Sequence, residues 1–476
     1  MYCALLLRGI IVAPALVGVW LAPANLGRTA DFLGDSREEL VVGAPGAGDQ
    51  PRSGVAFLYR GGAAGVVATE VLDQSSFGGN VQGDEFGAAF AVGDFDGDGA
   101  VDLAVGAPGE SGSGAVYIWR GTGGGLSPAA ALDQTGLGAA EPGDRFGAAL
   151  AAGDFDKDGY VDLAVGAPYD APNSRVSGAV YLFLGGPAGL RPGRLVDQTG
   201  LGVDEHGDRF GAALSSGDYD GDGHVDLAVG APGEAPGSDP RSGAVYLFRG
   251  SSRGVSPAQV LDQAGLSANE ADDQFGAALA SGDFDNDGHE DLAVGAPYEA
   301  PGAGPRSGAV FIFAGTPMGL EPRQFLVQDG LGVNEAGDDF GRALSSGDYD
   351  CDGWADLAVG APGEAPGGDP RSGAVFVFRG TDKKLVPLQV LTQTGLADNE
   401  HGDRFGAALA SANYVANHRE DLAVGAPGGA PRADPRSGAV YLFRGTASGL
   451  TPQQPIDQTK LGINEAGDRF GVALCE

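Results

Sequence analysis

A pair of motifs recurring about every 65 residues constrains the fold of this chain more than any other feature. Phenylalanine is followed by glycine seven times, at Phe86, Phe146, Phe210, Phe275, Phe340, Phe405 and Phe470. A Gly-Ala-Pro triplet begins at Gly43, Gly106, Gly166, Gly230, Gly295, Gly360 and Gly425. Repeats of this length indicate a supersecondary unit that buries its core against neighbouring copies.

Each unit contains four short strand patterns. It runs Asp-Arg-Phe-Gly-Ala-Ala-Leu, an acidic loop, Asp-Leu-Ala-Val-Gly-Ala-Pro, a Gly/Pro-rich turn, Ser-Gly-Ala-Val-Tyr-Leu-Phe and a last run such as Gln259–Leu261. Apolar and β-branched runs separated by Gly and Pro, without helical periodicity, predict strands. Four-stranded repeating units are the blades of a β-propeller, so we predict an all-β fold of antiparallel blades.

The two ends of the chain predict the number of blades. The chain begins with a unit that lacks Phe-Gly and ends with one that stops after Phe470–Leu474. Six complete units and these complementary fragments predict seven blades. Phe470–Leu474 would be the innermost strand of a blade whose other strands lie near Glu39–Gly43, Gly54–Tyr59 and Val71–Leu72, which leaves no open edge. The alternative is a gene fragment that stops by chance at Glu476.

Five units carry the string Asp-x-Asp-x-Asp-Gly-x-x-Asp, beginning at Asp94, Asp154, Asp218, Asp283 and Asp348. Each string puts four carboxylates within nine residues, and these repel one another unless a cation lies among them. Ca²⁺ takes six to eight oxygen ligands from flexible loops, so we predict about five Ca²⁺ sites. The alternative is five solvated acidic turns, because Asp and Gly are ordinary turn residues.

The ligands follow from the loop positions. Positions 1, 3, 5 and 9 offer carboxylates, position 7 offers a backbone carbonyl, and Gly at position 6 permits the turn. The predicted metal ligands are Asp94, Asp96, Asp98, Ala100, Asp102, Asp154, Asp156, Asp158, Tyr160, Asp162, Asp218, Asp220, Asp222, His224, Asp226, Asp283, Asp285, Asp287, His289, Asp291, Asp348, Asp350, Asp352, Trp354 and Asp356. The loops are not EF-hands, because position 12 of the first is Val105 rather than Glu.

The unit of Phe-Gly, acidic loop and Gly-Ala-Pro resembles the FG-GAP repeat of the integrin α-subunit N-terminal propeller and its bacterial relatives, from about Asp31 to Leu474. The resemblance implies seven blades, calcium between strands 1 and 2, and extracellular adhesion or protein recognition. Two units depart from the pattern: Leu33 replaces the second Asp of the first, and Val415 replaces the central carboxylate of the last full unit. We expect neither to bind metal. Without an inserted ligand-binding domain or leg-like domains, a true integrin subunit is not expected.

Charge and the N-terminal segment indicate the compartment. The net charge of −35 argues against a nucleic-acid partner, which requires clustered Lys and Arg. Residues 1–24 combine Arg8, an apolar run and Ala22-Pro23-Ala24, which is typical of a secretory signal and too short to span a membrane comfortably. The alternatives are a fragment start or a buried strand. We therefore expect a signal peptide over 1–24, a propeller over 25–476, secretion or surface display, a monomeric propeller and no transmembrane span.

The face opposite the acidic loops is the predicted partner surface. It carries the longer loops, and functional residues concentrate in loops on rigid scaffolds. It repeats the acids Glu110, Asp170, Glu234, Glu299 and Glu364 against the arginines Arg52, Arg241, Arg306, Arg371 and Arg436. We hypothesise that this face binds an extracellular protein or glycan. The alternative is that the acid–arginine pairs only tie neighbouring blades together.

No nucleophile with a nearby base stands out, so we predict no catalytic residues and no enzyme activity. The expected function is a protein-interaction or cell-adhesion module. One alternative is a lectin-like, glycan-binding propeller, which Trp119 in a core strand and Trp354 in a metal loop support only weakly. Another is a non-catalytic module of a secreted hydrolase.

Overall fold

The computed structural model describes residues 30–35, 37–48, 53–79, 81–172, 174–202, 205–236, 240–301, 306–368, 370–397, 400–429, 437–456, 458 and 467–475. The segment 1–24, predicted to be a signal peptide, lies outside these residues. Within the described ranges, no helix combines the length and the apolar character needed to cross a membrane.

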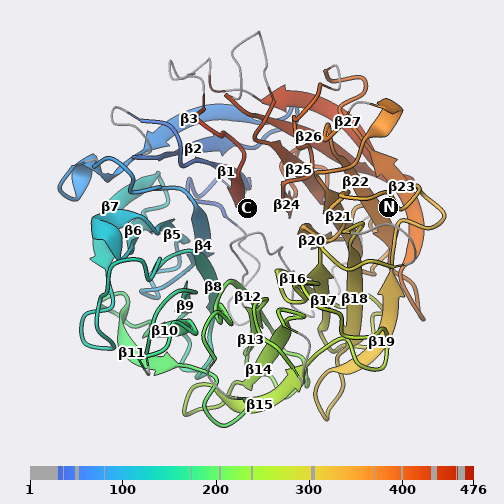
Figure 1. Cartoon of the computed structure of the whole chain (residues 1–476). Helices are drawn as coiled ribbons and strands as arrows, with labels where there is room; N and C mark the ends of the chain where they lie inside the picture. The colour runs from blue at the N-terminus through green and yellow to red at the C-terminus, as the bar shows by residue number, and fades with distance from the viewer. Residues whose placement is uncertain are drawn as a thin grey trace.

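Seven antiparallel sheets of four strands surround a central axis, as predicted (Figure 1). Six of them use consecutive strands. These are β4 (Ala89–Gly93), β5 (Asp102–Ala107), β6 (Ala115–Gly121), β7 (Leu126–Leu132); β8 (Ala149–Gly153), β9 (Asp162–Ala167), β10 (Ala179–Leu184), β11 (Arg191–Val196); β12 (Ala213–Gly217), β13 (Asp226–Ala231), β14 (Ala244–Arg249), β15 (Ser256–Leu261); β16 (Ala278–Gly282), β17 (Asp291–Ala296), β18 (Ala309–Ala314), β19 (Glu321–Leu326); β20 (Ala343–Gly347), β21 (Asp356–Ala361), β22 (Ala374–Arg379), β23 (Val386–Leu391); and β24 (Ala408–Ala412), β25 (Asp421–Ala426), β26 (Ala439–Thr446), β27 (Gly449–Ile456). Single 3₁₀ turns occur at η1 (Gln74–Ser76), η2 (Glu110–Gly112) and η3 (Pro366–Gly368).

The seventh blade joins the two ends of the chain. Its order is β28 (Ala473–Cys475), β1 (Glu39–Ala44), β2 (Val55–Arg60) and β3 (Val67–Leu72). β28 pairs antiparallel with β1, with Leu474 opposite Val42. The predicted closure is therefore confirmed, and the inner edge of β1 is covered.

Burial changes from the axis outward. All six residues of β13 are buried, whereas in β15 only Leu261 is. Apolar clusters form between adjacent blades: Phe155 and Val180 of one blade pack in the same cluster as Phe210 and Tyr246 of the next. The core is thus a set of inter-blade layers, and the outermost strands are mostly exposed, as β11 and β19 also show, with only their last residue buried.

The glycines of the repeat motifs form the joints between blades. A Cβ on Gly230 of the Gly-Ala-Pro triplet would lie 2.1 Å from the carbonyl oxygen of Gly276, the Phe-Gly glycine of the next blade. Gly243, which precedes β14, forms a parallel bridge with Phe275 of that next blade. Only glycine allows backbones to approach this closely. The glycines of both motifs therefore allow one blade to pack directly against the next.

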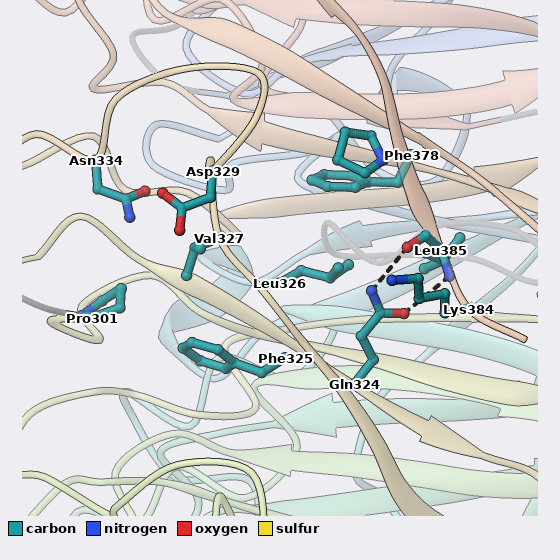
Figure 2. Close-up of a pocket in the computed structure, with 11 residues that line it drawn as sticks. Pro301, Gln324, Phe325, Leu326, Val327, Asp329, Asn334, Phe378, Lys384 and Leu385 are labelled. Atoms are coloured by element: carbon teal, nitrogen blue, oxygen red, sulfur yellow. Dashed lines mark hydrogen bonds between the residues drawn. The ribbon is translucent and has the colours of Figure 1, made fainter.

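A second joint lies at the outer rim. The Gln324 side chain of β19 donates from Nε2 to the Leu385 carbonyl at 2.9 Å and accepts from the Leu385 backbone N–H at 3.0 Å (Figure 2). Gln259 bonds Leu320, and Gln389 bonds Leu450, in the same reciprocal way. Each glutamine joins the outer strand of one blade to the turn before the outer strand of the next blade. These bonds fix the position of neighbouring blades relative to one another.

Candidate metal centres

The five acidic loops each connect the innermost strand of a blade to its second strand, as predicted. They therefore lie at the end of the propeller opposite the Phe-Gly turns. Each loop also contacts its neighbour: the Val161 N–H donates to the Asp94 carbonyl at 3.3 Å, and the Glu290 N–H donates to the Asp218 carbonyl at 3.2 Å. The loops form an interlinked series rather than independent turns.

The first aspartate of each loop organises the backbone. Asp94 Oδ1 accepts from the Asp98 N–H at 3.0 Å, and Oδ2 accepts from the Gly99 N–H at 2.8 Å. The same two bonds, at 3.0 to 3.1 Å, recur at Asp154, Asp283 and Asp348. Gly99 has φ +88°, a conformation that favours glycine. Position 6 therefore shapes the turn as the sequence predicts.

In four loops the aspartate at position 3 pairs with an arginine that the repeat motif does not predict. Asp96 pairs with Arg120 at the end of β6, and Asp350 pairs with Arg379 at the end of β22. Asp220 and Asp285 contact Arg249 and Arg323 at 2.5 and 2.6 Å. For Arg120, Arg249 and Arg379 the signal was available in the sequence as the arginine at the end of the third strand, whereas Arg323 comes from the outer strand β19 and has no such signal. One guanidinium against four aspartates leaves each of these loops strongly negative.

The aspartate at position 9 is the first residue of the second strand of its blade and is deeply buried. Asp226 Oδ2 accepts from the Tyr219 N–H at 3.2 Å, and Oδ1 accepts from the Gly250 N–H at 2.8 Å. Burial above all, with nearby carboxylates, raises the pKa of Asp226 to about 8. Asp421 makes a similar pair of bonds in the last full unit: Oδ2 accepts at 2.8 Å from the Val415 N–H, one loop position later than Tyr219, and Oδ1 accepts at 2.9 Å from the Gly445 N–H. Position 9 therefore ties the loop to the turn after the third strand whether or not a metal binds.

The donor set fits a hard divalent cation. Carboxylate oxygens lie within 4.8 Å of one another in three groups: Asp94, Asp96 and Asp102; Asp154, Asp156 and Asp162; and Asp218, Asp220 and Asp222. Position 5 is absent from the first two groups, and position 9 is absent from the third. Three buried carboxylate oxygens of the acidic loops, Asp218 Oδ1, Asp285 Oδ1 and Asp350 Oδ1, have no hydrogen-bond partner within the described residues. Buried acceptors without partners are rare, and an oxygen-only set suits Ca²⁺.

The predicted carbonyl donors at position 7 have side chains with other contacts. His224 Nδ1 lies 3.0 Å from Asp222 Oδ1, and Trp354 Nε1 donates to the Asp285 carbonyl of the neighbouring loop at 3.3 Å. Ligation by the carbonyls of Ala100, Tyr160 and the three other position-7 residues stays a prediction. Trp354 instead acts as a further link between neighbouring loops.

The first loop, in which Leu33 replaces an aspartate, still brings three carboxylates together. Asp31, Asp35 and Glu39 bring carboxylate oxygens within 4.8 Å of one another. Glu39 Oε2 accepts from the Phe32 N–H at 2.9 Å, which is the position-9 bond made by a longer side chain. Counting from Asp31 places these residues at positions 1, 5 and 9, a signal hidden by Leu33 at position 3.

On the opposite face, the repeated acids do not pair with the repeated arginines among the described residues. Glu234 accepts from Gln198 Nε2 and from the Tyr246 hydroxyl, both at 2.8 Å, and is buried between two blades. Arg241 instead pairs with Asp272 at 2.7 Å, and Arg306 lies over the Tyr298 ring at 4.6 Å from its centroid. Arg52 and Arg436 lie outside the described residues. The acids therefore join blades through glutamine and tyrosine, and the arginines stay at the surface.

Three blades have phenylalanine in place of that tyrosine, at Phe57, Phe311 and Phe376. Beside Phe376, the Gln328 amide lies next to Asp338 and Glu364, but it makes no hydrogen bond of full geometry to a described residue. Burial chiefly, with Asp338 second, raises the pKa of Glu364 to about 7. Burial raises the pKa of Asp338 to about 6. This inter-blade pocket therefore favours a protonated carboxyl near neutral pH.

The Glu364→Gln variant should flatten the pH dependence of stability. The folded protein keeps a proton on Glu364 that the unfolded chain loses near its ordinary pKa of 4.5, so the free energy of unfolding falls as pH rises from about 5 to 7. The amide mimics the protonated acid. We expect the variant to exceed the parent by about 1 to 2 kcal/mol at pH 8, and to match it near pH 5. Urea unfolding at both pH values, with exposed Glu321→Gln as control, measures this; parallel pH profiles of parent and variant would contradict it.

An open groove lies at the outer rim between two blades (Figure 2). It holds about 570 Å³ and is lined by Gln324–Val327 of the β19 region, Phe378, and the turn around Leu385. Its polar groups, Gln324 and the Leu385 backbone, already bond one another. Trp119, considered above for glycan stacking, is only 3% exposed and therefore unavailable to a sugar.

Comparisons with known proteins agree with the repeat pattern. Five segments match the FG-GAP repeat family, at residues 86–119, 146–183, 210–248, 275–313 and 340–378. Each begins at the phenylalanine of Phe-Gly and runs through the acidic loop into the third strand. The family match therefore covers the structural parts that build the candidate centres.

The curated relatives include two kinds of protein, the integrin alpha subunits and a phospholipase D. Rattus norvegicus phosphatidylinositol-glycan-specific phospholipase D is 38% identical over 182 residues, covering 37% of this chain and 21% of that protein. Drosophila melanogaster integrin alpha-PS2 is 35% identical over 243 residues, with 49% and 16% covered. Xenopus laevis integrin alpha-5 is 35% identical over 225 residues, with 44% and 20% covered. The chain spans about a fifth of the length of these relatives.

One likeness among solved structures extends over nearly the whole chain. A provisionally assigned 6-phosphogluconolactonase of Bacteroides fragilis has a TM-score of 0.50 at 14% identity, covering 92% of this chain and 98% of its own. At this identity the likeness shows the propeller fold alone.

Proposed function

We propose that this protein is a calcium-binding extracellular β-propeller. Its FG-GAP repeats, and its similarity to integrin α-subunits and to phosphatidylinositol-glycan-specific phospholipase D over the matched regions, support this proposal. It acts as a protein-interaction and cell-adhesion module and is secreted or displayed at the cell surface. One observation carries the proposal: equivalent loops of successive blades gather carboxylates within 4.8 Å, and buried oxygens in these loops lack partners.

Different loop positions have different roles in each acidic loop. Positions 1 and 9 hold the backbone through paired N–H bonds, and position 3 is held by arginine. Each carboxylate oxygen retains a second lone pair for a cation. Bound Ca²⁺ would supply the charge neutralisation that one arginine per loop does not. The loops would then be stiffened into a rigid base for the opposite face.

Calcium uptake tests the cofactor. Chelator-stripped protein titrated with CaCl₂ in a calorimeter should bind about five ions. The double variant Asp283→Asn/Asp287→Asn copies Asn413 and Asn417 of the last full unit, whose loop is folded with Asn413 Oδ1 accepting from the Asn417 N–H at 2.8 Å. It should bind one ion fewer and stay folded. No heat of binding in the parent would overturn the cofactor assignment.

A protein array tests the interaction function. Immobilised propeller is probed against purified extracellular proteins and against glycans, with calcium and with EDTA. Calcium-dependent retention of a protein, lost when residues 270–274 and 298–301 on the opposite face are scrambled, supports the proposal. Retention of glycans alone supports the lectin-like alternative.

A second candidate is a non-catalytic module of a secreted hydrolase, which the 38% identity to the phospholipase over 182 residues favours. We propose no catalytic role for the propeller itself. His224 and His289 sit at position 7 of acidic loops, and His224 already contacts Asp222. Assay of the isolated propeller for phosphodiester and lactone hydrolysis tests this, and turnover above that of a heat-denatured sample would contradict it.

A further inference from the structure

The residue at position 7 of several acidic loops reaches the loop of the preceding blade. The Trp354 side chain donates from Nε1 to the Asp285 carbonyl at 3.3 Å, and Arg419 donates from Nε to the Asp350 carbonyl at 3.4 Å. Both acceptors belong to position 3, whose aspartates are predicted calcium ligands. Position 7 therefore contacts a ligand residue of the neighbouring site in addition to its own loop.

In two further loops the side chain at position 7 is a ring that packs on the preceding loop. A Cβ on Gly97 would lie 2.4 Å from Tyr160 Cε1, and a Cβ on Gly221 would lie 2.5 Å from His289 Nδ1. Both glycines stand at position 4 of their loops. A side chain at either place would collide with the ring, so each ring lies directly against the backbone of the preceding loop.

Position 4 of one loop is thus matched to position 7 of the next. Where position 4 is glycine, a ring packs over it; where position 4 is Asn286, the Trp354 indole bonds the carbonyl just before it. Position 4 has φ of +73° in Gly97, +70° in Gly221 and +54° in Asn286. This left-handed conformation turns the chain between the ligands at positions 3 and 5, and it costs free energy in a residue other than glycine. The neighbouring loop therefore contacts the segment that must be held to bring these ligands together.

The link is most complete between the loops that begin at Asp283 and Asp348. The Ala355 N–H donates to the Asp283 carbonyl at 3.2 Å, beside the bond from Trp354 to Asp285. Positions 1 and 3 of one loop are therefore held by positions 8 and 7 of the next. The Trp354 backbone carbonyl is also a predicted ligand of its own loop, so this residue belongs to two candidate ion sites.

Sharing one residue couples the free energies of binding at the two sites. When its carbonyl is held as a ligand, the Trp354 backbone is already ordered, and its indole reaches Asp285 at a smaller cost in conformational entropy. When Asp285 is held as a ligand, its carbonyl is likewise fixed for the indole. An ion at either site therefore reduces the ordering cost at the other, and the effect on affinity is equal in both directions.

One pair of loops is joined differently and serves as an internal comparison. Position 7 of the loop beginning at Asp218 is His224, whose Nδ1 lies 3.0 Å from a carboxylate oxygen of its own loop. Position 4 of the preceding loop, which begins at Asp154, is Lys157, and a Cβ on Gly223 would lie 2.6 Å from its Nζ. At this junction the lysine extends toward the following loop, and the residue at position 7 turns to its own loop.

We propose that neighbouring calcium loops bind their ions cooperatively, and that Trp354 is the positioning residue that couples the site beginning at Asp348 to the site beginning at Asp283. This inference rests on the calcium binding proposed above and adds to it a dependence between sites. The two sites fill together over a narrow range of calcium concentration, so this part of the loop face becomes ordered in one step.

Calorimetric calcium titration of full-length variants with two intact loops tests the coupling. Three of the five loops receive asparagine at positions 1 and 5, as in Asn413 and Asn417 of the last full unit, and only the loops beginning at Asp283 and Asp348 remain. Two one-loop proteins, in which either of these loops is replaced as well, give the separate affinities. The two-loop protein should bind its second ion about fivefold more tightly than the one-loop isotherms predict.

The emission of Trp354 gives an independent readout. In the one-loop protein that keeps only the loop beginning at Asp283, the indole still lies on Asp285. Calcium should therefore change the emission of Trp354 although its own loop binds no ion. Trp119 is buried in β6, away from the acidic loops, and should contribute a constant background.

Two substitutions of Trp354 separate the indole N–H from the carbonyl ligand. Trp354→Arg supplies an N–H donor, as Arg419 does to Asp350, whereas Trp354→Phe keeps a ring without a donor. In the one-loop protein that keeps the loop beginning at Asp348, neither should change the calcium affinity, because only the backbone carbonyl is used there. In the two-loop protein, Trp354→Phe should remove the gain in affinity, and Trp354→Arg should retain it.

A two-loop protein that keeps the loops beginning at Asp154 and Asp218 is the matched control and should show additive isotherms. A gain of equal size there, additive isotherms for the Asp283 and Asp348 loops, or an undiminished gain in Trp354→Phe would overturn the proposal. In each of these cases calcium binding itself still stands. No calcium uptake by the parent protein would instead reject the proposed cofactor, and with it the coupling.

Discussion

Chelation of calcium should destabilise this propeller by more than any single substitution in its loops. A ligand that binds only the folded state, at about a hundred times its dissociation constant, stabilises by about 2.7 kcal/mol per site. Five such sites would add up to roughly 10 kcal/mol or more. The effect has a direct cause in the structure, because each loop gathers four aspartates and four of the five loops pair them with a single arginine.

Urea unfolding of the same preparation in excess CaCl₂ and in EDTA measures this difference. MgCl₂ is the matched control, because Mg²⁺ demands near-ideal octahedral geometry and retains its water. The Asp283→Asn/Asp287→Asn variant should be less stable than the parent in calcium and more stable in EDTA, since it removes both a site and its repulsion. Coincident unfolding curves with and without EDTA would show that the loops are solvated acidic turns.

Removal of residues 470–475 should open the ring and cause association. The deletion takes away β28, exposes the inner edge of β1, and removes Phe470, which is fully buried with its ring 5.3 Å from that of Phe57. Burial of one phenylalanine alone is worth about 3 to 5 kcal/mol. An unpaired strand edge is in addition a template for aggregation.

The point variant Phe470→Ala separates the loss of the buried phenylalanine from the loss of the β28–β1 strand pairing. It should cost about 3 to 5 kcal/mol in urea unfolding while the ring stays closed and the protein stays monodisperse. The deletion should be less stable than this variant and should show concentration-dependent light scattering. A deletion protein as stable and as monodisperse as Phe470→Ala would contradict the closing role of β28.

The blade architecture could be predicted because its signals lie within one repeat. Gly and Pro separate four apolar runs, and the two incomplete ends complement one another, which is why the β28–β1 pairing was predictable. The metal loops were equally local, since nine consecutive residues carry the four aspartates. Positions 1 and 6 accordingly behave as the spacing indicates.

What could not be predicted depends on contacts between segments. Arg120 reaches Asp96 across two strands of one blade, and Gln324 reaches Leu385 across two blades. The acid–arginine pairs considered as the alternative to a binding face do not form at Glu234, because this residue turns inward to Gln198, a residue of the preceding unit. Glu39 escaped notice because its longer side chain makes, from a different residue type, the bond made elsewhere by aspartate.

The glycine joints have a consequence for how this protein arose. Every blade presents the same Gly-Ala-Pro glycine and the same pre-strand glycine to its neighbour, and receives the same Phe-Gly turn, as in Gly230 against Gly276 and Gly243 against Phe275. Any unit can therefore sit beside any other without a new interface being evolved. Tandem duplication of one ancestral unit would yield a closed ring at once, and sequence divergence could then be confined to the loops.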